Sequence, residues 1–142
     1  MKNNLLNYLT LVLIIVAFSI LIVFYSKAGF SVNSFTYIGL ALIIPSLVFF
    51  TIARIQLGSS FQVSAEANKL VTEGLYKKIR HPVYLFGLLF LLGFIIFIQM
   101  FYLLVFWGAL IFLQRRRIKK EEKVLEEKFG EQYIKYKRET WF

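Results

Sequence analysis

Hydrophobic residues gather in three long runs, at positions 5–25, 35–53 and 83–113, and polar segments separate them. The first two runs have the length of a membrane-spanning helix, about 20 residues. We predict a retained span in each, because the first run is longer than the apolar part of a secretion signal. Pro45 lies inside the second run, where it favours a kink.

The third run predicts a helical hairpin. As one straight helix it would be about 46 Å long, well beyond a hydrocarbon core of about 30 Å. Two shorter helices that turn near positions 99–102 fit the membrane and return the chain to its starting face. The prediction is therefore an all-α integral membrane protein with about four membrane helices, in which Gly87, Gly93 and Gly108 allow close helix approach.

The tail after position 113 predicts an amphipathic helix. Gly130 is expected to kink or interrupt it. Ion pairs are expected between Arg117 and Glu121 and between Lys123 and Glu127, which lie four residues apart. Spacings of four, three, four and four place five residues on one helix face: Ile118, Glu122, Leu125, Phe129 and Tyr133.

Charge is the next constraint. The 142 residues are 58% hydrophobic with a formal net charge of +9, and most basic residues lie at positions 54–80 and 115–138, beside apolar runs. This pattern is typical of cytoplasmic loops and of anionic headgroup contact, so we expect both termini on the cytoplasmic side and no nucleic-acid partner. The chain has no Cys, which excludes disulfides and a thiolate nucleophile. It also has no Asp and a single His, which disfavours a protein metal site. We expect one domain over 1–142, with two spans in 1–53 and a loop, hairpin and tail in 54–142.

The segment GLYKKIRHPVY, positions 74–84, holds the candidate chemistry. Pro82 suits the first turn of the third run's helix, which puts Arg80 and His81 at the membrane interface. A plain alternative is a helix start with interfacial anchors, in which Tyr76 and Tyr84 belong to an aromatic belt.

A helix start with interfacial anchors does not explain the position of Glu122. This carboxylate sits on the apolar face of the tail helix, so it needs a partner. The hairpin brings the tail back to the Arg80–His81 segment, which makes Arg80 or His81 the expected partner unless a ligand fills that role.

The motifs G-x-Y-x-x-x-R-H-P-x-Y, then E-E-x-x-L and F-G-x-x-Y after an apolar hairpin, resemble the isoprenylcysteine carboxyl methyltransferase family, which is related to membrane phospholipid methyltransferases. The resemblance covers roughly positions 53–137. It implies a membrane methyltransferase that uses S-adenosylmethionine and a lipid or lipophilic acceptor, with its cofactor site on the cytoplasmic face.

The resemblance also implies roles for individual residues. Arg80 and Glu122 are the expected catalytic residues, with Arg80 holding a carboxylate of cofactor or substrate. The expected cofactor-binding residues are Tyr76, His81, Pro82, Tyr84, Glu121 and Glu122.

Three alternatives stay open beside an isoprenylcysteine-type carboxylate acceptor. They are an amine N-methyltransferase of the phospholipid type, a membrane reductase that uses a nicotinamide cofactor, and a lipid-binding membrane protein without catalysis. The first requires deprotonation of the amine, for which Glu122 or His81 is suited.

Overall fold

The computed structural model describes residue 19, residues 32–58 and residues 70–141. The chain divides into two compact units, Met1–Asn33 and Ser34–Phe142, and the following description concerns the second. The predicted span at 5–25 lies outside the described residues apart from Ser19, which is helical.

The described part is all-helical. In chain order it contains α2 (Ser34–Leu57), the 3-10 helix η2 (Gly74–Lys77), α3 (Pro82–Ile98), the 3-10 helix η3 (Phe101–Leu103), α4 (Leu104–Phe129) and α5 (Glu131–Glu139). Between residues 70 and 141 the one bridge between extended segments joins Ile79 to Trp141. The all-α prediction is confirmed for this part of the chain.

Helix α2 is the described helix that is long and apolar enough to cross a membrane, and α3 is a shorter apolar helix. The helix assignment continues through Pro45. The predicted number of four spans and their orientation stay predictions.

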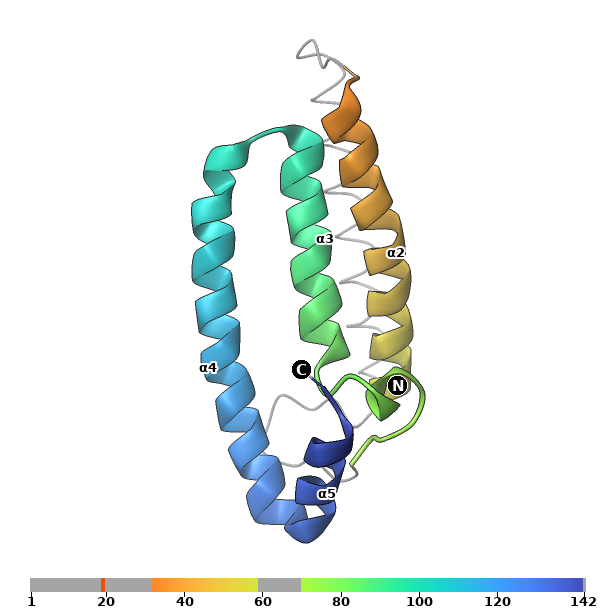
Figure 1. Cartoon of the computed structure of the whole chain (residues 1–142), viewed down its shortest axis with the longest axis vertical. Helices are drawn as coiled ribbons and strands as arrows, with labels where there is room; N and C mark the ends of the chain where they lie inside the picture. The colour runs from red at the N-terminus through yellow and green to blue at the C-terminus, as the bar shows by residue number, and fades with distance from the viewer. Residues whose placement is uncertain (1–18, 20–31, 59–69, 142) are drawn as a thin grey trace. The chain divides into compact units, whose positions relative to one another are not determined.

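The chain reverses direction where the hairpin was predicted. Helix α3 ends at Ile98, and Gln99 adopts a left-handed conformation with φ 59°. One 3-10 turn follows before α4 begins at Leu104. Figure 1 shows α3 and α4 running in opposite directions on either side of this turn.

The second arm and the charged tail form one unbroken helix, which the apolar pattern alone had not indicated. Residues 114–117, Gln-Arg-Arg-Arg, are good helix formers without Gly or Pro, so α4 continues from the apolar stretch into the charged one. The helix ends at Phe129, and α5 begins at Glu131; Gly130 between them has a φ of 51°, which suits glycine. The predicted interruption at Gly130 is confirmed.

Helices α2 and α3 pack closely through small residues. A Cβ atom built on Gly93 would lie 2.8 Å from the Cβ of Leu42, and one on Gly39 would lie 2.7 Å from the backbone of Phe97. The expectation for Gly93 is confirmed. Among the described residues, a Cβ atom on Gly87 would meet Phe50 at 3.6 Å, which is an ordinary contact, and one on Gly108 would meet no atom within 4 Å. Close approach at Gly108 is therefore not found in the described part.

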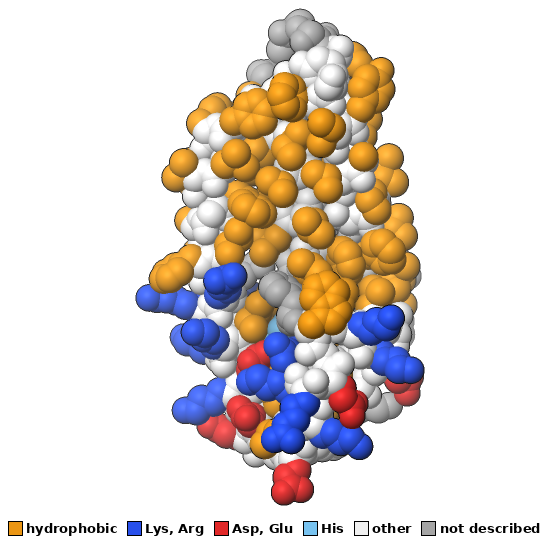
Figure 2. Space-filling model, viewed as in Figure 1, with side chains coloured by type: hydrophobic (Ala, Val, Ile, Leu, Met, Phe, Trp, Pro, Cys, Tyr) orange, Lys and Arg blue, Asp and Glu red, His pale blue; other side chains and the backbone are white. Residues whose placement is uncertain are grey.

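The surface of α2 is inverted relative to that of a helix in a water-soluble protein. Its buried residues are mostly small: Thr36, Gly39, Ile43, Ser46 and Ala53. Many large apolar side chains of α2 and α4 are exposed instead, and Figure 2 shows them covering one end of the visible face while Lys, Arg and Glu gather at the other. This distribution is typical of helices that pack through small residues and face lipid with large ones.

Candidate functional site

A cluster of charged side chains lies where α3 begins and α4 passes it. Helix α3 starts at Pro82, in the first-turn position predicted for it, and His81 precedes it as the N-cap residue. The Pro82 side chain is almost fully buried. This start fixes Arg80 and His81 beside the charged part of α4.

Glu122 is the centre of the cluster. Its Oε1 atom lies 3.4 Å from Nε of Arg80 and 3.4 Å from Nε2 of His81, and its Oε2 atom lies 3.0 Å from Nζ of Lys137. The Glu122 side chain is only 14% exposed. The predicted pairing of Glu122 with Arg80 and His81 is confirmed.

Helix α5 closes the cluster from the third side. Besides the Lys137 ammonium, the backbone carbonyl of Lys137 accepts a hydrogen bond of 3.0 Å from Nη1 of Arg80. The chain after α5 returns to the segment before α3, where the Trp141 N–H donates to the carbonyl of Lys78 over 3.0 Å. These contacts hold the guanidinium between α4 and α5.

Electrostatics fix the charge states of the acid and the imidazole. Burial opposes the ionisation of Glu122, but the Lys137 hydrogen bond and the charges of Arg80 and Lys137 outweigh it and lower the pKa of this carboxyl. Burial lowers the pKa of His81 despite the nearby Glu122. At neutral pH the cluster therefore contains an ionised Glu122 and a neutral His81.

Glu121 forms a neighbouring polar group. It accepts a hydrogen bond of 2.5 Å from the Tyr84 hydroxyl and pairs with Nε of Arg117 at 3.4 Å. The predicted pair of Lys123 and Glu127 also forms, at 3.8 Å. Tyr84 thus contacts Glu121, and its ring also lies beside that of His81, with 5.9 Å between the ring centroids.

Tyr76 stands apart from this arrangement. Its side chain is buried, its hydroxyl donates to the carbonyl of Ala53 at 3.4 Å, and its own carbonyl accepts a hydrogen bond of 2.6 Å from Tyr136. Burial raises the pKa of the Tyr136 phenol to about 12. The contacts of Tyr76 in the structure connect η2 to α2 and α5.

Sequence reasoning did not assign a role to Lys137, Tyr133 or Tyr136. Tyr133 was placed on the apolar face of the tail, and one further helical turn along the same face reaches Tyr136 and Lys137. Tyr133 is only 1% exposed, and its hydroxyl has no hydrogen-bond partner within the described part. Burial raises the pKa of the Tyr133 phenol, the charge of Glu122 raises it further, and the charge of Arg80 lowers it.

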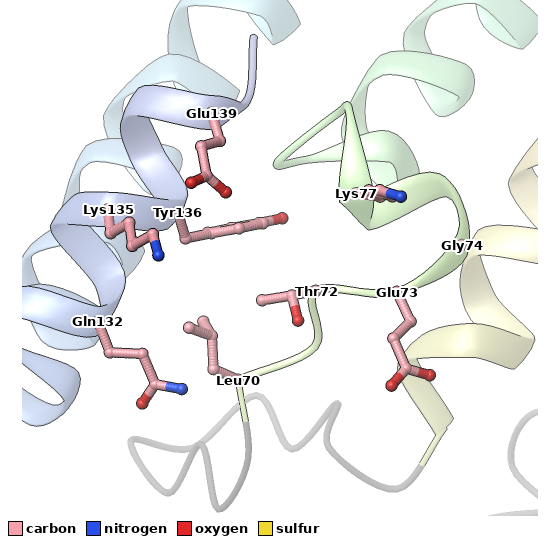
Figure 3. Close-up of a pocket in the computed structure, with 9 residues that line it drawn as sticks. All are labelled: Leu70, Thr72, Glu73, Gly74, Lys77, Gln132, Lys135, Tyr136 and Glu139. Atoms are coloured by element: carbon pink, nitrogen blue, oxygen red, sulfur yellow. The ribbon is translucent and has the colours of Figure 1, made fainter.

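A pocket of about 450 Å³ lies between the segment before α3 and helix α5, with the Tyr136 ring in its lining (Figure 3). This volume falls within the range of small-molecule sites. The pocket carries cationic, anionic and amide side chains around the Tyr136 ring, from both segments. Its lining consists of Leu70, Thr72, Glu73, Gly74, Lys77, Gln132, Lys135, Tyr136 and Glu139.

None of the predicted site residues lines this pocket. The pocket and the cluster are neighbours along α5, because Tyr136 lines one and Lys137 belongs to the other. Among the residues that the structure describes, no three His, Cys, Asp or Glu side chains gather as metal ligands would.

Comparison with known proteins assigns the chain to a family. A family model with the description "Protein of unknown function (DUF1295)" matches residues 4–140. Neither a curated protein nor a solved structure gives a significant match.

Proposed function

Because the chain belongs to the DUF1295 family, whose function is unknown, we propose a function from the site itself: S-adenosylmethionine-dependent methyl transfer to a lipid or lipophilic acceptor. The observation that carries this proposal is the convergence of Arg80, His81 and Glu122. Arg80 and His81 lie just before the first helix of the hairpin, and Glu122 lies in the charged part of the second, so they meet at the open end of the hairpin.

The side chains present fit the chemistry of this cofactor. S-adenosylmethionine carries a carboxylate, an ammonium, ribose hydroxyls and a cationic sulfonium. Arg80 suits the carboxylate, and Glu121 and Glu122 suit the ammonium or the hydroxyls. Two buried donor atoms of the cluster, Nε of Arg80 and the hydroxyl of Tyr133, lack hydrogen-bond partners within the described part, which leaves capacity for a polar ligand.

The pocket beside α5 supports the same proposal. It adds space and an aromatic ring, that of Tyr136, the residue before Lys137 on α5, and these suit the nucleoside end of a ligand whose charged end lies in the cluster. We propose the cluster and the pocket as parts of one cofactor site.

When bound, the cofactor supplies a methyl group on a sulfonium that is ready for displacement. The protein's contribution is then to position the ligand and exclude water, for which the mostly buried Arg80, His81 and Glu122 side chains are suited. A carboxylate acceptor needs no base. An amine acceptor must lose a proton, and the buried, neutral His81 is the group in the cluster able to accept it.

The exposed apolar surface supports a membrane setting. Contiguous apolar patches of this kind mark contact with lipid or with protein partners. We propose that α2, α3 and the first part of α4 lie in the bilayer and that the cluster lies at its cytoplasmic face, beside the basic residues of α4.

Calorimetric titration of the purified protein in detergent tests the proposal. We expect saturable binding of S-adenosylmethionine and S-adenosylhomocysteine, and no binding of NADPH. Glu122→Gln and His81→Ala should each abolish cofactor binding, whereas Glu127→Gln, at an exposed carboxylate on the same helix, should bind as wild type does.

Folded wild-type protein that binds neither ligand up to about 1 mM, an affinity weaker than about −4 kcal/mol, would overturn the proposal. Binding of NADPH alone would favour the reductase alternative. Wild-type affinity in both Glu122→Gln and His81→Ala would show that the cluster only supports the fold.

A further inference from the structure

Trp141 is held to the protein by its backbone, while its indole ring is exposed. The Trp141 N–H donates to the carbonyl of Lys78 over 3.0 Å, and Trp141 forms the bridge to Ile79. Its side chain is nevertheless 62% exposed. A large aromatic side chain fixed at the surface offers apolar area and an N–H donor to a partner. The place of Trp141 in the fold indicates which partner that is.

Trp141 lies near the border between the charged and the apolar part of the molecule. Figure 1 shows the segment after α5 returning to the start of α3. Helix α3 is apolar from Pro82 to Ile98, whereas Lys77 and Lys78, shortly before it, are exposed cations. Tryptophan is enriched at membrane–water interfaces, because its ring can meet lipid while its N–H meets water.

Helix α4 shows the same border independently. Its exposed side chains are apolar up to Leu113 and basic from Arg115 to Arg117. The guanidinium carbon of Arg116 lies 4.5 Å from the centroid of the Phe112 ring, which is itself exposed. An arginine that lies over an apolar ring covers apolar surface while its charge stays in a polar layer. This arrangement is typical of the point where a helix leaves the hydrocarbon core.

The opposite end of the apolar part also has exposed aromatic residues with polar groups. Tyr37, in the first turn of α2, and Tyr102, in η3, are 67% and 65% exposed. The rings of Phe35 and Phe101 contact each other with 5.4 Å between centroids, which places the start of α2 beside η3. Between the two ends runs α3, whose 17 residues span about 26 Å, close to a hydrocarbon core of about 30 Å. Aromatic residues at both ends of such a layer are typical of a membrane protein.

The two aromatic residues that the sequence offered as interfacial anchors near Pro82 are engaged inside the protein. Tyr76 is 5% exposed and donates to the carbonyl of Ala53. Tyr84 donates to Glu121. The role of an interfacial anchor at this end therefore falls to Trp141.

We propose that Trp141 is a lipid-contact residue whose indole ring lies in the headgroup layer of the bilayer and holds the end of α5 against the membrane. This inference rests on the proposed placement of α2, α3 and the first part of α4 in the bilayer, and it adds the C-terminal segment to the membrane contact. The partner is lipid, because the exposed ring continues the border that α3 and α4 define.

The anchor also positions the candidate site. The buried Thr140 donates a hydrogen bond of 2.8 Å to the carbonyl of Tyr136, which fixes the segment between α5 and Trp141. Tyr136 lines the pocket, and Lys137 pairs with Glu122. Contact of Trp141 with lipid therefore keeps the pocket and the cluster at the bilayer surface, where the head of a lipophilic acceptor lies.

Tryptophan fluorescence tests the inference, because the chain has two tryptophans, Trp107 and Trp141. Trp107→Phe leaves Trp141 as the fluorophore, and Trp141→Phe leaves Trp107 as the depth control. Each protein is reconstituted into phosphatidylcholine vesicles whose acyl chains carry bromine, a contact quencher, either near the headgroup or near the methyl end. Trp107 lies eight residues before Arg115, about 12 Å along α4 and so near the middle of the core.

We expect opposite orders of quenching in the two proteins. Bromine near the headgroup should reduce the emission of Trp141 more than bromine near the methyl end, and the reverse should hold for Trp107. Acrylamide in the water should quench Trp141 less than it quenches free tryptophan. If Trp107→Phe does not fold, the difference in quenching between wild type and Trp141→Phe gives the contribution of Trp141.

The outcomes separate this inference from the proposal on which it rests. If bromine at neither depth quenches Trp107, the proposed membrane placement fails and the inference fails with it. If deep bromine quenches Trp107 and neither set quenches Trp141, the placement stands and the lipid contact of Trp141 is wrong; acrylamide then distinguishes a ring in water from one covered by a second protein copy. Stronger quenching of Trp141 by deep than by shallow bromine would place the ring in the core and also overturn the inference.

Discussion

Nζ of Lys137 lies 3.0 Å from Oε2 of Glu122, which is the shortest contact that this carboxylate makes with a cation in the described structure. The pair joins α5 to the C-terminal, charged part of α4. It also lowers the pKa of Glu122, together with Arg80 and against the effect of burial. Lys137 therefore contributes both to the ionised state of Glu122 and to the attachment of α5 to α4.

Replacing Lys137 with Met should lower the stability of the protein by about 1 kcal/mol at neutral pH, because Glu122 is mostly buried while Lys137 is partly exposed. Chemical unfolding in detergent measures the change. Lys123→Met is the matched control, since Lys123 pairs with Glu127 at an exposed position and should change stability by less than about 0.5 kcal/mol. Equal effects of the two substitutions would contradict the role given to Lys137.

The sequence predicted the pairing of Glu122 but not its full set of partners. A carboxylate on an apolar helix face must be satisfied, and the hairpin left Arg80 and His81 as candidates. Lys137 lies one turn beyond Tyr133 on that face, but the spacing was followed only as far as Tyr133. A lysine near a helix end also has the ordinary role of a solvated side chain.

The packing face of α2 was not predictable from hydrophobicity. Apolar residues occur all around α2, so an apolar stripe does not distinguish the two faces. The useful signal is the recurrence of small residues at Thr36, Gly39, Ser46 and Ala53, which are buried. Gly39 in particular provides the close approach to Phe97 that the sequence reasoning assigned only to glycines of the third run.

Acid should destabilise the protein through His81. Burial lowers the pKa of His81, so the unfolded chain takes up the proton first, near the ordinary value of 6.5. Stability is then constant above this pH and falls below it, by at most about 1.4 kcal/mol per pH unit, until the pH reaches the folded-state pKa. Glu122, whose pKa is also lowered, adds a second loss as the pH falls below its ordinary value of 4.5.

Melting temperatures in a non-ionic detergent between about pH 7.5 and about pH 5 measure the His81 contribution. His81→Gln cannot titrate, so its melting temperature should vary less over this interval than that of the wild type. An identical pH dependence in the two proteins would contradict the assignment.

Trp107 should stabilise the contact between α3 and α4. Its indole Nε1–H donates a hydrogen bond of 2.9 Å to the backbone carbonyl of Leu88. Trp107→Phe keeps an aromatic ring but loses the donor, and should cost about 1 kcal/mol, the size of such bonds between membrane helices. Trp141→Phe is the control, because Trp141 is 62% exposed and should tolerate the change. A stability of Trp107→Phe equal to that of wild type would show that the bond contributes nothing.

Gly93 and Gly108 should respond in opposite directions to the same substitution. In Gly93→Ala the new methyl group would lie 2.8 Å from Cβ of Leu42 and 3.1 Å from the carbonyl oxygen of Gly39, so α2 and α3 must move apart. We expect a loss of about 1–3 kcal/mol, typical of overpacking. In Gly108→Ala the methyl group meets no described atom within 4 Å, and the better helix propensity of alanine should leave stability unchanged or raise it by up to about 1 kcal/mol. Unfolding of both variants in the same detergent measures the difference, and a Gly93→Ala protein as stable as Gly108→Ala would contradict the close packing of α2 against α3.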